Sequence, residues 1–196
     1  MTKKSITVQV GEITDTGGSG VAALIGYYEP KHYAPSIIEN CHLLSGAVSE
    51  TNNMGGLIGY LQVQEKNVAV DVTIKDCSNA TNVTAEARET GGILGLAQFS
   101  SDELGTIGAM NFENCTNSGN IVTQNGGGVS CAGGILGWEN TLIYKGKIQI
   151  VFTGCKNEGR VVLNGENKGE QTIGYCLLFF IADILYNTCA LSNGLK

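Results

Sequence analysis

Aromatic residues recur directly after a repeated glycine phrase, and rings at such a repeated position could bind flat or apolar ligands. Four copies of the phrase carry Tyr27, Tyr60, Trp138 and Tyr175 at this position, and the middle copy carries Leu96. If the copies lie over one another with the rings exposed, the rings form a platform for sugars or an apolar partner. If the rings are buried, they pack beneath the loop that follows, which is the commoner role of repeated aromatic side chains. The column is therefore a candidate ligand-binding site with a packing alternative.

Cysteine and asparagine recur together in a second phrase. The cysteines are Cys41, Cys77, Cys115 and Cys155, and the asparagines two residues after the last three of them are Asn79, Asn117 and Asn157. In stacked copies the thiols should form a buried column, because cysteine behaves as a small apolar side chain. The asparagine amides should hydrogen-bond from copy to copy as a structural ladder. The only histidines are His32 and His42, and no Cys-x-x-Cys pair occurs, so no metal site is predicted.

Acidic residues could cleave polysaccharides, a reaction that many parallel β-helix proteins catalyse. Glycoside hydrolysis needs two carboxyl groups about 5–10 Å apart. The residues two before each cysteine are instead Glu39, Lys75, Glu113 and Thr153, and their alternation predicts outward neighbours that neutralise each other. Charged residues make up only 15% of the chain, without a concentrated acid–base cluster. We therefore expect a protein that is not an enzyme and needs no cofactor, with a polysaccharide-cleaving β-helix as an alternative.

The elements that position these residues follow from the repeat itself. The four cysteines lie 36, 38 and 40 residues apart, and the last glycines of the glycine phrase lie 33, 36, 42 and 37 residues apart. Constant phrases at a drifting spacing predict rigid segments joined by loops of variable length. Apolar residues alternate at Val68, Val70, Val72 and Ile74, which is the period of a strand and not of a helix.

Each repeat is predicted to contain three short strands: one that ends at the cysteine, one a few residues later, and one at the glycine phrase. The glycine pairs 55–56, 91–92 and 133–134 indicate a tight corner, or a backbone approach too close for a Cβ atom. Because one repeat cannot bury its own apolar face, the repeats must stack. The prediction is an all-β fold, a parallel β-solenoid of about 4–5 coils with one 33–42-residue repeat in each coil.

The chain is predicted to form a single domain over residues 1–196. Residues 1–36 form a partial coil, residues 37–175 the repeats, and residues 176–196 an apolar cap that covers the edge of the last coil. This cap could be a helix between Cys176 and Leu191, and its apolar part is too short for an integral membrane span. The chain opens half-way through a coil and without a signal peptide, so we expect either a segment of a longer exported protein or a deliberate cap.

The two phrases together resemble the GLUG-motif repeats of bacterial surface proteins. The resemblance covers about residues 20–175 and is clearest at residues 74–95 and 112–137. The first coil departs from it at His42-Leu43-Leu44, and the last coil loses its glycine pair at Gln171-Thr172. The resemblance implies a right-handed parallel β-helix, located outside the cytoplasm in an adhesin-like protein. It supplies no catalytic residues.

These observations predict a non-enzymatic module of a cell-surface or secreted protein, acting as an adhesive, binding or spacer segment. Its expected partner is a host or bacterial surface glycan or protein. Nucleic acid is not expected, because the formal net charge is −6 and such binders concentrate Lys and Arg. The alternatives are the polysaccharide-cleaving enzyme and a carbohydrate-binding module that uses the rings of Tyr27, Tyr60, Trp138 and Tyr175.

Overall fold

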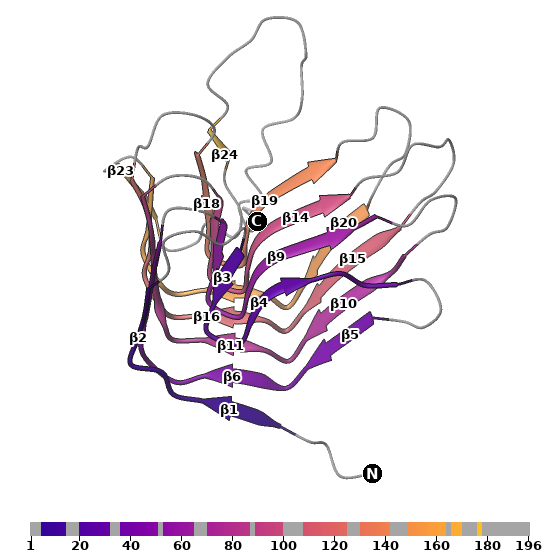
Figure 1. Cartoon of the computed structure of the whole chain (residues 1–196), viewed down its shortest axis with the longest axis horizontal. Helices are drawn as coiled ribbons and strands as arrows, with labels where there is room; N and C mark the ends of the chain where they lie inside the picture. Colours follow the sequence, from indigo (N-terminus) through magenta and orange to yellow (C-terminus); the bar gives the residue numbers. More distant parts are fainter. Residues whose placement is uncertain are drawn as a thin grey trace, which may run out of the picture.

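The protein is a β-solenoid whose strands wind into coils that lie one above another (Figure 1). The computed structural model describes residues 5–14, 20–31, 36–50, 53–64, 70–86, 89–99, 108–124, 130–141, 149–163, 166–169 and 176–177. Within these ranges all regular elements are strands, and five parallel sheets follow one another along each coil. The predicted all-β parallel solenoid is confirmed.

The five sheets are numbered here in the order in which a coil visits them. Sheet 1 contains β5 (Ser36–Glu39), β10 (Val72–Lys75), β15 (Ala109–Glu113) and β20 (Gln149–Thr153). Sheet 2 contains β1 (Ile6–Val8), β6 (Cys41–Leu43), β11 (Ser78–Asn79), β16 (Thr116–Asn117) and β21 (Lys156–Asn157). Sheet 3 contains β2 (Glu12–Thr14), β7 (Ala47–Glu50), β12 (Asn82–Ala85), β17 (Ile121–Thr123), β22 (Val161–Leu163) and β23 (Glu166–Gly169). Sheet 4 contains β3 (Gly20–Ala22), β8 (Asn53–Gly55), β13 (Glu89–Gly91), β18 (Ser130–Gly133) and β24 (Cys176–Leu177). Sheet 5 contains β4 (Ile25–Tyr28), β9 (Ile58–Val63), β14 (Leu94–Phe99) and β19 (Leu136–Thr141).

The predicted number of coils needs a correction. Three coils are complete, with one strand in each sheet: β5 to β9, β10 to β14 and β15 to β19. A partial coil, β1 to β4, precedes them, and a second partial coil, β20 to β22, follows. The parallel pattern stops there, because β23 pairs antiparallel with β22 and β24 pairs antiparallel with β18. The expected 4–5 coils are therefore three complete coils between two incomplete ones.

Each complete coil contains five strands where the sequence predicted three. One extra break falls just before the cysteine, where Asn40, Asp76 and Asn114 have φ between 52° and 55° and Gly154 has φ of 63°. Residues in this left-handed conformation interrupt the ladder and turn the chain, and Asn, Asp and Gly tolerate it best. The other break falls inside the glycine phrase, at residues 56–57, 92–93 and 134–135, which separate sheet 4 from sheet 5.

The repeated phrases lie directly over one another, as the repeat predicts. The Cα pairings are Glu39↔Lys75↔Glu113↔Thr153, Asn79↔Asn117↔Asn157, Gly55↔Gly91↔Gly133 and Tyr27↔Tyr60↔Leu96↔Trp138. Every repeated position in the described coils is therefore a column of side chains along the solenoid axis.

The interior consists of two apolar clusters. The larger one packs between sheets 1, 2 and 5 and includes Phe112, Ile74 and the four column cysteines. The smaller one packs between sheets 3 and 4 around Met54, Val83 and Ile121. Burial of each such side chain contributes on the order of 1.5–3 kcal/mol. The strands alternate as expected, since Val72 and Ile74 of β10 are buried while the residues between and after them are not.

The predicted C-terminal cap is described only at its start, where residues 176–177 form β24. The remainder, residues 178–196, and Tyr175 lie outside the described residues. Within the described ranges, no helix has the length and apolar character needed to cross a bilayer.

Candidate functional site

The aromatic column forms on sheet 5, and its members differ widely in exposure. Tyr27 of β4 is 46% exposed, whereas Tyr60 of β9 is 8% exposed and Leu96 of β14 is 6% exposed. Trp138 of β19 is half-buried. The middle of the column is thus packed inside the protein, and Tyr27, at its N-terminal end, is the member that offers a ring to solvent.

The tyrosine rings do not form a flat platform. The ring centroids of Tyr27 and Tyr60 are 5.3 Å apart with an interplanar angle of 72°, an edge-to-face arrangement. The Tyr27 hydroxyl donates to Oε1 of Gln62 at 2.9 Å, and the Tyr60 hydroxyl donates to Oε1 of Gln98. Burial, followed by the influence of Tyr27, raises the pKa of Tyr60, which keeps its hydroxyl a donor. The two hydroxyls therefore connect the partial coil to the first complete coil, and that coil to the next. The sequence analysis missed this role of the glutamines.

The predicted asparagine ladder is present and runs along the end of sheet 2, where the asparagines are the last residues of β11, β16 and β21. Asn79 Nδ2 donates to Asn117 Oδ1 at 2.8 Å, and Asn117 Nδ2 donates to Asn157 Oδ1 at 2.7 Å. Each Nδ2 also donates to a backbone carbonyl two residues ahead in its own coil, at 2.8–2.9 Å. The three side chains are almost fully buried. Their amides are thus satisfied by the stack itself.

The second glycine of each glycine pair makes room for this ladder. A Cβ atom on Gly92 would lie 2.0 Å from the carbonyl oxygen of Gly134 and 2.5 Å from Cγ of Asn117. The equivalent atoms on Gly56 and Gly134 would meet Asn79 and Asn157 in the same way. The close approach expected from the glycine pairs is therefore confirmed, and its partner is the asparagine of the following coil.

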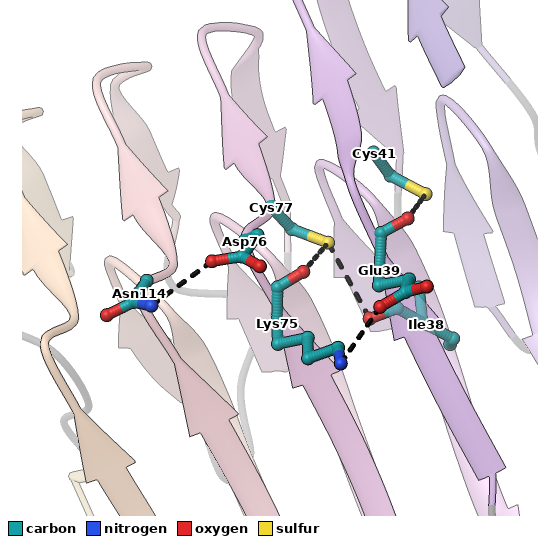
Figure 2. Close-up of polar contacts among 7 residues, drawn as sticks. All are labelled: Ile38, Glu39, Cys41, Lys75, Asp76, Cys77 and Asn114. Carbon is teal, nitrogen blue, oxygen red and sulfur yellow. Dashed lines mark hydrogen bonds and ion pairs between the residues drawn. The ribbon is translucent and has the colours of Figure 1, made fainter. Parts of the chain in front are cut away.

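The cysteine column is buried and consists of free thiols. Each sulfur lies near the carbonyl oxygen two residues earlier, for example Cys77 Sγ and Lys75 O at 3.1 Å (Figure 2). Cys115 and Cys155 also reach a carbonyl of the preceding coil, both at 3.3 Å. Burial, followed by the neighbouring Cys77, raises the pKa of Cys41 to about 11. Such a thiol stays protonated at neutral pH and is a poor nucleophile.

The charged column on sheet 1 faces outward and is partly neutralised within itself. Lys75 Nζ lies 2.9 Å from Glu39 Oε2, and this bond, followed by the charge of Glu39, raises the pKa of Lys75 (Figure 2). At the adjacent corner Asn114 Nδ2 donates to Asp76 Oδ1 at 3.1 Å, which joins two left-handed residues of successive coils. The predicted pairing across strands is confirmed for Glu39 and Lys75. This pair brings a carboxylate and an ammonium group together, whereas glycoside hydrolysis needs two carboxyl groups on either side of the substrate bond.

Glu139 is a carboxylate in an apolar column, which the sequence analysis also missed. It directly follows Trp138 and is in register with Ala97 and Leu61, both fully buried. Its Oε1 is buried without a hydrogen-bond partner, and burial raises the pKa of Glu139 to about 7. Alignment of the repeats could have predicted this carboxylate, because its column has leucine, alanine and then glutamate in successive coils.

Glu139→Gln should stabilise the protein at alkaline pH and leave its stability at low pH nearly unchanged. The folded state holds the proton more tightly than the unfolded state, whose pKa is near 4.5, so stability is lost as pH rises from there through about 7. The full shift corresponds to at most about 3 kcal/mol, which partial solvent contact reduces to about 1–2 kcal/mol. Urea unfolding at pH 5 and pH 8 measures the difference.

The control for this prediction is Glu113→Gln, which changes the same side chain on the outer face of sheet 1. It should show no comparable gain in stability at pH 8. Equal urea midpoints for the wild type and Glu139→Gln at pH 8 would show that the Glu139 carboxylate is well solvated.

Among the described residues, no group of three His, Cys, Asp or Glu side chains is placed to hold a metal ion. No protein-family profile, curated protein or solved structure matches this chain. The likeness to GLUG-motif repeats and the surface role that it implies therefore stay predictions.

Proposed function

We propose that this chain is a non-enzymatic module of a cell-surface or secreted protein, in which the solenoid acts as a spacer or adhesive segment. The asparagine ladder is the observation that carries the proposal. Asn79, Asn117 and Asn157 would be reactive or ligand-binding amides if exposed, but they direct their hydrogen bonds along the stack. The column thiols and the hydroxyl of Tyr60 also direct their hydrogen bonds to groups within the stack, such as Ile74 O for Cys115 and Gln98 for Tyr60. The repeated side chains hold the coils at a fixed spacing, which is what a spacer requires.

The cysteines support an exported location. Cys131 of β18 is buried and disulfide-bonded, and it lies opposite Cys176 in the pairing of β18 with β24. Disulfides form and persist mainly in oxidising compartments, such as the cell surface and the extracellular space. The four column thiols are compatible with such a compartment, because burial protects them from reaction.

A spacer built in this way should unfold coil by coil under tension. Each repeat contacts mainly its neighbours, so the solenoid can lose one coil while the next one stays folded. Repeats of 36, 38 and 40 residues would release about 13–14 nm each at roughly 3.6 Å per residue. Single-molecule force spectroscopy on the chain, pulled from its two ends, measures these increments. A single unfolding event that releases the whole chain at once would contradict the proposal.

Carbohydrate binding is a second candidate, favoured by the exposure of Tyr27 alone. The residue is 46% exposed, its hydroxyl contacts Gln62, and the charges of Glu29 and Lys31 lie close enough to influence its pKa. An exposed ring bordered by polar groups suits a sugar. A glycan array probed with the wild type and with Tyr27→Ala separates the candidates. Glycan retention that is lost in a folded Tyr27→Ala variant would favour carbohydrate binding over a spacer.

A further inference from the structure

Cys131 of β18 is disulfide-bonded, and the sequence leaves two cysteines that can be its partner. The chain contains seven cysteines, and the four of the thiol column are free. Because Cys131 itself is bonded, its partner is one of the two that remain, Cys176 or Cys189. Both follow β22, the last parallel strand. Whichever of them is the partner, the bond links the third complete coil to the C-terminal part of the chain.

The register of the strands selects Cys176. Strand β24 pairs antiparallel with β18, and Cys131 is directly opposite Cys176 in this pairing (Figure 1). Directly opposed residues of an antiparallel pair have Cα atoms about 4.5–5.5 Å apart, which lies inside the range of about 4.4–6.8 Å that disulfides span. Cys189 is 189 − 176 = 13 residues further along the chain and lies outside the described residues. Because β24 has only two residues, a covalent bond at Cys176 would supply much of what holds this strand on β18.

The chain between Cys131 and Cys176 contains the partial coil that ends the parallel stack. It runs from β19 through β20, β21 and β22 to β23. Among the described strands, β20 and β21 pair with a neighbour on one side only. Phe152 of β20 is partly exposed, whereas Phe112, its partner in β15, is fully buried. Strands that have one neighbour lose the fewest contacts when they detach, so opening from the C-terminal side should begin in this partial coil.

A bond between Cys131 and Cys176 bypasses this partial coil mechanically. Tension applied to the C-terminal end of the chain would pass at residue 176 through the bond to Cys131, without loading the strands between the two residues. Cys131 is fully buried, and β18 lies between β13 and β24 in sheet 4. The load is thereby transferred from strands with one neighbour to a strand that has a neighbour on each side.

We propose that Cys131 and Cys176 form a redox latch, a disulfide that limits the length to which the solenoid can extend. The latch closes when the two thiols give two protons and two electrons to a small disulfide such as oxidised glutathione, which becomes two thiols. One thiolate attacks the small disulfide, and the second attacks the resulting mixed disulfide and releases its other half. While the latch is closed, the 176 − 131 = 45 residues that it encloses cannot be drawn out, so all three repeats release their full length only in the reduced chain. This device rests on the proposed spacer role, because only a load-bearing module has an extension to limit.

Peptide mapping tests the pairing directly. The wild type is equilibrated with oxidised glutathione, its free thiols are alkylated, and it is digested without reduction. The digest should contain one pair of peptides joined through Cys131 and Cys176, which a reductant separates. Cys189 and the four column cysteines should be recovered as alkylated free thiols. A link between Cys131 and Cys189, or a Cys131 recovered as a free thiol, would overturn the proposal and leave the spacer role as it stands.

Force spectroscopy tests the mechanical consequence. Pulled from its two ends, the oxidised wild type should reach a total contour length about 16 nm shorter than the same protein in dithiothreitol, at about 3.6 Å for each of the 45 enclosed residues. Cys176→Ser should show the longer value in both buffers, and Cys189→Ser, the matched control, should behave like the wild type. Equal contour lengths of the wild type with and without dithiothreitol would overturn the latch. A single unfolding event that keeps the difference of about 16 nm would support the latch and contradict the spacer role alone.

Discussion

Replacing Asn117 by alanine should lower the free energy of unfolding by about 3–5 kcal/mol. Asn117 is the middle rung of the buried ladder: it accepts from Asn79 Nδ2 and donates to Gly119 O and Asn157 Oδ1. Its loss leaves the amide groups of both neighbours short of a partner, away from water. Each unsatisfied buried polar group costs about 1–3 kcal/mol, and the vacated volume adds to this cost.

Urea unfolding followed by the fluorescence of Trp138, the single tryptophan, measures this loss. Asn120→Ala is the matched control, because Asn120 is exposed and its side chain makes one longer contact, from Arg160 N at 3.3 Å. The control should lose less than about 1 kcal/mol. Similar losses in the two variants would mean that the ladder contributes no more than a surface hydrogen bond.

The architecture could be predicted because the repeat sets the register. Once Cys77 and Cys115 occupy one column, every neighbouring position is fixed, and the asparagine ladder and the Glu39–Lys75 pair follow. The number of strands per coil could not be predicted. The left-handed conformations of Asp76 and Asn114 split what reads in the sequence as one strand. Asn, Asp or Gly does recur before each cysteine, but these residue types permit a left-handed conformation without requiring it.

The aromatic column shows a different limit of sequence reasoning. Alignment of the repeats places Tyr27, Tyr60 and Trp138 at one position, but it carries no information about what covers each ring. Tyr60 is buried where Tyr27 is exposed, although the two residues are the same and neighbours in the column. Position along the axis decides the difference, because among the described strands β4, which carries Tyr27, is the first of its sheet, whereas β9, which carries Tyr60, lies between two others. A residue that is exposed at one end of the solenoid can therefore have a buried, purely structural equivalent in the middle of the same column.

The glycine phrase and the cysteine phrase are coupled across coils, and the first coil shows this. Where the later repeats pair a glycine with an asparagine of the following coil, Ala23 of the partial coil β1 to β4 stands at the glycine position, and Leu43 of the following coil stands at the asparagine position. Both exchanges occur together, and both side chains pack against the larger apolar cluster. An added Cβ is thus accommodated where no asparagine ladder passes. In the later coils the glycine avoids both the asparagine side chain and a backbone carbonyl of the next coil.

Gly92→Ala should consequently destabilise the protein by more than about 4 kcal/mol or prevent it from folding. The added Cβ would lie 2.0 Å from the carbonyl oxygen of Gly134, and backbone of the next coil can move only by opening the stack. It would also lie 2.5 Å from Asn117 Cγ, so both the backbone and the ladder would have to shift. The φ angle of Gly92 is not positive, so the expected cost comes from space and not from backbone strain.

Gly11→Ala is the matched control, since a Cβ on Gly11 meets no atom within 4 Å. It should leave the free energy of unfolding within about 0.5 kcal/mol of the wild-type value, because the same chemical change meets open space. Soluble yield, far-ultraviolet circular dichroism and urea unfolding of the two variants measure the contrast. A Gly92→Ala variant that folds with wild-type stability would mean that successive coils are not held at the spacing on which the ladder, the thiol column and the spacer role depend.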